Sequence, residues 1–119
     1  MSGLQRSGTR IACEISAMLG LLDSLHLPSE PCLIIVVNPQ GCAARFNRPL
    51  EIGAGVWLEG LPVRGATARV ANCISIAGFA NLWLLGLALD EPGNVWGIVT
   101  PPEDWEVDLP MRPPDSAQG

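Results

Sequence analysis

The sequence contains no lysine. All seven of its cations are arginines, set against twelve acidic residues in a chain of 119 residues with a formal net charge of −5. A protein that binds duplex DNA needs a basic stripe along the phosphates, so this balance argues against that class of partner. It leaves room for a small anionic ligand, because an arginine recognises phosphate through a local two-pronged contact rather than through bulk charge. The length suits one domain with a single core.

The sequence also lacks the motifs of common catalytic sites. Its one histidine, His26, stands near Pro28 in a segment that we expect to be an exposed loop. Neither GxSxG nor HExxH occurs, and the glycines of GAGVWLEG (residues 53–60) do not have the spacing of a dinucleotide-binding fingerprint. We therefore expect no enzymatic activity and no cofactor.

No CxxC pair occurs among the cysteines, and no histidine cluster accompanies them, so a metal site is not predicted. The four are Cys13, Cys32, Cys42 and Cys73. The apolar stretch ISAMLGLLDSLHL (15–27) contains Asp23 and is not followed by a cleavage site, so it does not resemble a secretion signal. Two disulfides would be possible in a secreted chain, but we expect buried, reduced thiols in a cytoplasmic protein.

The longest run without a charge, VANCISIAGFANLWLLGLAL, extends from Val70 to Leu89 and has the length of a membrane-spanning helix. Asn72, Ser75 and Asn81 would place polar side chains in hydrocarbon, and the AGFAN stretch predicts a turn in the middle. We expect two strands joined by a loop and no membrane span. A membrane-associated β domain is the weakest alternative.

Short apolar and β-branched runs separated by Gly, Pro and Asn predict an all-β domain. In the first run, Ile11, Cys13 and Ile15 alternate with Glu14 and Ser16, as expected for a strand with one buried face. The predicted strands are IACEISAM (11–18), CLIIVV (32–37), CAARF (42–46), GVWLEG (55–60), ATARVANCISI (66–76) and LWLLGLALD (82–90). The pattern predicts an antiparallel barrel or sandwich without a long helix.

Two of the four tryptophans bracket a proline-rich segment in NVWGIVTPPEDW (94–105). Thr100 stands directly before a proline and three positions before Glu103, a capping-box spacing that predicts a single helical turn beginning at that proline. We expect this turn to dock Trp105 on the domain with Trp96 beneath it, as a lid. The indoles could instead form an apolar surface for a ligand or partner.

Two further motifs resemble those of the PilZ family of small β-barrels. Arg6-Ser7-Gly8-Thr9-Arg10 matches the family's RxxxR, and VVNPQGCAARF carries a D/NxSxxG-like turn that begins at Asn38. The likeness continues through PLEIGAGVWLEG, ATARV and LLGLALDEPGNVWGI to PPEDW, so it covers about residues 6–105. It implies a small antiparallel six-stranded β-barrel over residues 11–105 with a short C-terminal helical turn. A flexible arm, residues 1–10, would precede the barrel, and a disordered tail, residues 106–119, would follow.

For such a barrel between Ile11 and Leu89, we expect an interior that includes the following apolar side chains. They are Ile15, Ile35, Val37, Val56, Val70, Ile74, Leu85 and Leu87.

The resemblance also implies cyclic di-GMP as a ligand, because arginine can bind either a phosphate or a guanine edge through two hydrogen bonds. The site residues carried over are Arg6, Arg10, Asn38, Gln40 and Gly41. The chain departs from the motif where Gln40 replaces the serine and Ala43 replaces the final glycine. We therefore expect a bacterial signalling domain with weak or lost cyclic di-GMP binding. The alternative is a nucleotide-independent adaptor of the same fold that binds a protein of unknown identity.

Overall fold

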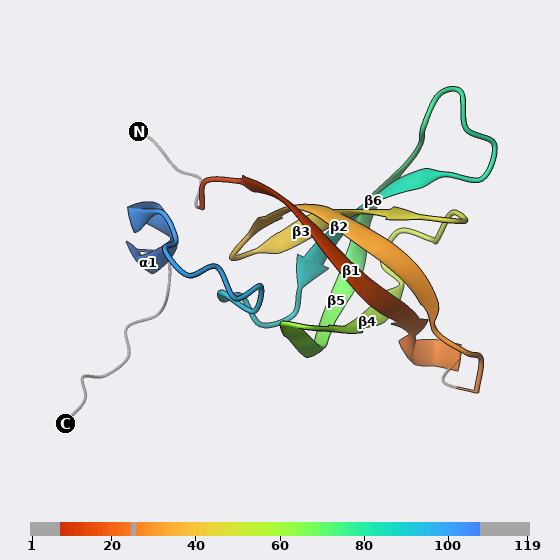
Figure 1. The fold of residues 1–119 in the computed structure, drawn as a ribbon. Helices are drawn as coiled ribbons and strands as arrows, with labels where there is room; N and C mark the ends of the chain where they lie inside the picture. The colour runs from red at the N-terminus through yellow and green to blue at the C-terminus, as the bar shows by residue number, and fades with distance from the viewer. Residues whose placement is uncertain (1–7, 25, 108–119) are drawn as a thin grey trace.

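A computed structural model describes residues 8–24 and 26–107 of the chain (Figure 1). Arg6, a predicted site residue, lies outside these ranges. Of the predicted tail, 106–119, the first two residues belong to the C-terminal helix and 108–119 lie outside the described ranges. The secondary-structure elements, in chain order, are β1 (Ile11–Leu21), the 3₁₀ turn η2 (Leu22–Ser24), β2 (Glu30–Asn38), β3 (Gly41–Phe46), β4 (Gly55–Gly60), β5 (Val63–Ser75), β6 (Trp83–Leu89) and α1 (Glu103–Val107).

The six strands form a closed antiparallel barrel in the order β1-β2-β3-β6-β5-β4. β1 closes the barrel by pairing with β2 on one side and, through Met18 to Leu21, with β4 on the other. Closure satisfies the backbone groups that an open sheet would leave at its edges. The predicted all-β class and the six-stranded barrel are confirmed, and the apolar run from Val70 to Leu89 forms two strands joined by a loop.

Most of the predicted interior is confirmed. Five of the expected residues are buried, namely Val37, Val56, Val70, Leu85 and Leu87. Ile15 is partly buried and packs against this core. The strand alternation that the sequence displays therefore places the expected face of most strands inward.

The predictions for Ile35 and Ile74 are wrong, because both strands contain a β-bulge. The register shifts between Ile34 and Val36 in β2 and between Val70 and Asn72 in β5. An extra residue reverses the alternation beyond the bulge, so side chains that would point inward in a regular strand point outward. Ile34 is buried and Ile35 only half-buried, while Ile74 is 57% exposed.

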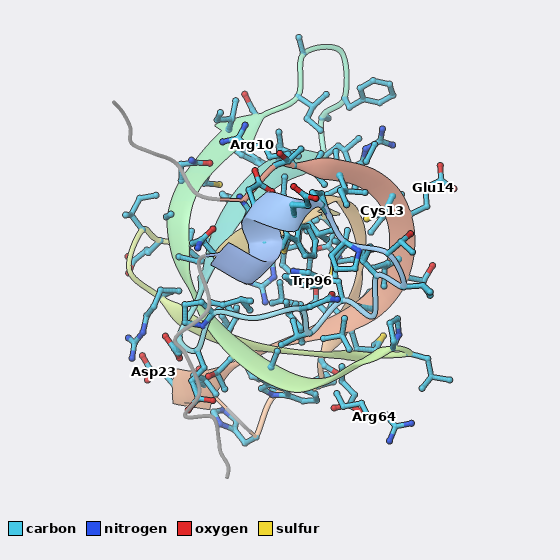
Figure 2. All side chains as sticks on the ribbon, turned by 90° about the vertical axis from the view of Figure 1, so that its left-hand side faces the viewer. Arg10, Cys13, Glu14, Asp23, Arg64 and Trp96 are labelled. Atoms are coloured by element: carbon cyan, nitrogen blue, oxygen red, sulfur yellow. The ribbon has the colours of Figure 1, made fainter. Side chains whose placement is uncertain are left out.

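The lid prediction is confirmed. α1 lies across one end of the barrel, with the labelled Trp96 beneath it in the view of Figure 2. Trp96 is 1% exposed and Trp105 is 2% exposed. The helix begins at Glu103 rather than at Pro101 as predicted. A residue that precedes a proline is disfavoured in helical conformation, and Pro101 precedes Pro102, so the turn starts later.

All four cysteines are free thiols, as predicted. Burial raises the pKa of the Cys32 thiol to about 11 and also raises the pKa of Cys13 and Cys42. These three side chains face the core from β1, β2 and β3, where they stay protonated at neutral pH and act as small apolar groups. In the part of the chain that the structure describes, no helix is long and apolar enough to cross a membrane.

Candidate functional site

The turn between β2 and β3 is organised by the side chain of Asn38. Its Oδ1 accepts hydrogen bonds from the backbone N–H groups of Gln40 and Gly41, each at 3.0 Å. This is an Asx-type turn, in which a short amide replaces backbone hydrogen bonding. The backbone carbonyl of Asn38 accepts a further bond of 2.7 Å from the indole Nε1 of Trp96. The turn that is predicted to bind the ligand therefore also contacts the lid, through Trp96.

Residues Gly8–Arg10 are the described part of the predicted arm (residues 1–10), and they lie against this turn. From here on, the arm means these three residues. Asn38 Nδ2 donates a hydrogen bond of 3.3 Å to the carbonyl of Gly8. Gly8 has a φ of +93°, and a Cβ at this position would lie 2.6 Å from Cδ of Pro39 and 3.1 Å from Oε1 of Gln40. Only glycine combines this backbone conformation with so close an approach.

A groove of about 500 Å³ runs from the arm over the outer face of β2, β3, β6 and β5. Four predicted site residues, Arg10, Asn38, Gln40 and Gly41, line it together. We call this the arm groove. Beyond this end, the lining is mostly apolar and includes Val36, Ala43, Ala71, Leu84, Gly86 and Ala88. The side chain of Asn72 adds a polar group next to Gly86. The topology thus brings together Arg10 and a turn almost thirty residues away, as the motif order predicted, while Arg6 lies outside the described residues.

Arg10 is the one cation among the described residues that line the arm groove. The ion pairs found within the described ranges are Arg48 with Glu30 and Arg69 with Asp90, and Arg10 takes part in neither. Its guanidinium is exposed and accessible to an anion.

Gly41 has a structural role that does not depend on any ligand. A Cβ at Gly41 would collide with the backbone carbonyl of Leu87 in β6. Glycine at this position allows β3 and β6 to approach at the lid end of the barrel. A substitution of Gly41 would therefore disturb the fold before it could report on binding.

The lid also holds the arm, through contacts that no pattern in the sequence predicts. The indole Nε1 of Trp105 donates a 2.6 Å hydrogen bond to the carbonyl of Thr9. Asp104 Oδ2 accepts two bonds from Thr9, at 2.9 Å from its backbone N–H and at 2.7 Å from its Oγ1. Thr9 and Asp104 are 95 positions apart, so no local motif or spacing links them.

Two buried acceptors at this end of the barrel have no hydrogen-bond partner among the described residues. They are Oε1 of Gln40 and Oδ1 of Asp104. A buried acceptor left without a partner costs roughly 1–3 kcal/mol. Gln40 also lines the arm groove, so its amide is a candidate hydrogen-bonding group for a ligand there.

Within residues 8–24 and 26–107, no three His, Cys, Asp or Glu side chains come together as a metal-binding group. His26 is exposed, as predicted.

No protein-family model matches the chain, and no curated protein matches it. The PilZ resemblance therefore remains a hypothesis that rests on the order and spacing of the motifs.

Proposed function

We propose that this chain is a PilZ-like signalling domain that binds cyclic di-GMP weakly in the arm groove. The observation that carries the proposal is the meeting of Arg10 and the Asn38 turn along one groove. Its volume of about 500 Å³ lies within the range typical of small-molecule sites.

Residues of the arm groove can bind two parts of cyclic di-GMP, its phosphates and its guanine bases. The exposed guanidinium of Arg10 can bind a phosphate or the O6 and N7 atoms of a guanine through paired hydrogen bonds. The apolar lining offers a surface on which the face of a base can lie. Arg6 would supply a second cation, as the RxxxR resemblance implies.

The same geometry accounts for weak binding. The N–H groups of Gln40 and Gly41 already donate to Asn38 Oδ1, so the turn has few donors left for a phosphate. Gln40 also stands where the motif has a serine hydroxyl. Each missing hydrogen bond to a charged group removes roughly 1.5–3 kcal/mol, which is about ten- to 150-fold in affinity.

Titration calorimetry with cyclic di-GMP tests the proposal. We expect Arg10→Ala, alone or together with Arg6→Ala, to abolish the heat of binding, and binding of the unmodified chain to weaken as salt rises. Arg64→Ala is the matched control, because it removes the same charge from an exposed position on the opposite side of the barrel (Figure 2). Equal losses in the Arg10 and Arg64 variants would mean that the effect comes from net charge rather than from the groove.

A second experiment restores the residues of the family motif. We expect Gln40→Ser with Ala43→Gly to strengthen binding, because it returns a hydroxyl to the turn and widens the groove at β3. It also removes a buried acceptor that has no partner among the described residues. If this variant gives no heat at millimolar cyclic di-GMP, the nucleotide proposal is wrong.

The adaptor function then becomes the better proposal, and one observation favours it. The β5–β6 hairpin carries no charge between Val70 and Leu89 and projects from the barrel (Figure 1). On it, Ile74 is 57% exposed and Phe79 is 61% exposed. Large exposed apolar side chains on a projecting element are typical of protein-binding surfaces.

A further inference from the structure

We infer that Asp104 of α1 is a positioning residue for Arg10: it holds Thr9 and thereby fixes where Arg10 enters the arm groove. The consequence for ligand affinity rests on the proposed function. The hold itself does not, because its contacts lie entirely within the chain.

Thr9 is held by α1 through every polar group that it has. Its N–H and its hydroxyl both donate to one carboxylate oxygen, Asp104 Oδ2, at 2.9 and 2.7 Å. Its carbonyl accepts the 2.6 Å bond from Trp105 Nε1. Asp104 accepts two of these three bonds, both at an exposed position, and the third, from Trp105, is partly buried.

The rest of the arm is held less firmly. The side-chain hydrogen bond from the barrel to Gly8 is the single 3.3 Å contact from Asn38 Nδ2. Arg10, on the other side of Thr9, is exposed and forms no ion pair among the described residues. α1 therefore fixes the backbone on the N-terminal side of Arg10 through Thr9. On the other side, Ile11 is fixed by its pairing with Val37 in β2.

This arrangement links the groove to the lid. If the arm leaves α1, Arg10 is correctly placed for only part of the time, and the apparent affinity falls by that fraction. Linkage is reciprocal, so a ligand that binds Arg10 should also favour the docked position of α1. Signal transmission from the groove to the C-terminal helix would follow from these contacts without any change in the barrel.

The first test needs no ligand. Trypsin cleavage after Arg10 reports release of the arm together with the first residues of β1, and cleavage after Arg45 in β3 reports opening of the barrel. We expect Asp104→Ala to speed cleavage after Arg10 about tenfold or more while cleavage after Arg45 is unchanged. Asp104→Asn, which keeps an acceptor oxygen for Thr9, should have a smaller effect. An unchanged rate after Arg10, or equal acceleration at both sites, would overturn the inference.

The second test measures affinity for cyclic di-GMP by calorimetry. Asp104→Ala and Thr9→Val should each weaken binding, Asp104→Ala by about tenfold or more, whereas Thr9→Ser keeps the hydroxyl and should bind like the original chain. Unchanged affinity in Asp104→Ala would show that Asp104 does not position Arg10. If the unmodified chain and the motif-restored variant both give no heat, the nucleotide proposal fails, and the cleavage assay still decides whether Asp104 holds the arm.

Discussion

At the scale of the residue, Asn38 connects three parts of this end of the barrel: the β2–β3 turn, the arm and the lid. Its amide oxygen shapes the turn, its amide nitrogen reaches the arm and its backbone carbonyl receives the indole of Trp96. Aspartate and asparagine both offer the oxygen that accepts the two turn N–H groups, so either residue can organise a turn of this geometry.

We predict that Asn38→Asp will be tolerated and that Asn38→Ala will destabilise the domain. Aspartate retains the acceptor for Gln40 and Gly41, and its second oxygen faces the Gly8 carbonyl only at the long distance of 3.3 Å. Alanine leaves two backbone N–H groups without their partner. The expected loss for alanine is roughly 1–3 kcal/mol in the free energy of unfolding, measured by urea denaturation. Equal stability of the two variants would contradict this role of the turn.

At the scale of the element, α1 is too short to be stable as an isolated helix, since it has five residues. Its position is set by tertiary contacts: the buried indole of Trp105 and the hydrogen bonds to Thr9. The preceding segment contributes Trp96, which lies beneath α1 and bonds to the β2–β3 turn. The lid is thus stable only through its contacts with the barrel and the arm.

Deletion of residues 93–119 should therefore lower the melting temperature. Burial of one indole contributes roughly 2–3 kcal/mol, and two are lost, which is a large share of the stability of a domain of this size. A matched deletion that removes only residues 108–119 leaves both indoles in place and should have a much smaller effect. Thermal unfolding followed by circular dichroism measures both; an unchanged melting temperature in the longer deletion would rule out the lid as a stabilising element.

At the scale of the whole molecule, closure of the barrel brings the arm and α1 to the same end, with the β5–β6 hairpin projecting away from it (Figure 1). The β-bulges at Ile34/Val36 in β2 and at Val70/Asn72 in β5 decide that Ile35 and Ile74 do not face inward. Ile74 therefore lies on the outer surface of β5, whereas a regular alternation would have placed it in the core.

The bulge in β5 can be tested with one pair of substitutions. Ile74→Ser should change the free energy of unfolding by less than about 0.5 kcal/mol, because this side chain is largely exposed. Leu85→Ala, at a fully buried position in β6, should cost roughly 2–5 kcal/mol. Denaturant unfolding compares the two variants; a large loss in Ile74→Ser would place this residue in the core and remove the bulge.

Local patterns in the sequence were sufficient for the strands, the turn at Asn38, the free thiols and the burial of the two lid tryptophans. These features depend on alternation, turn residues and apolar content over a few positions, which the chain displays directly. Tertiary structure alone decided the orientation of Ile35 and Ile74 and the contact between Thr9 and Asp104. A bulge is fixed by pairing with neighbouring strands, and a hydrogen bond across 95 positions exists only once the barrel has closed, so neither leaves a periodic signal in the sequence.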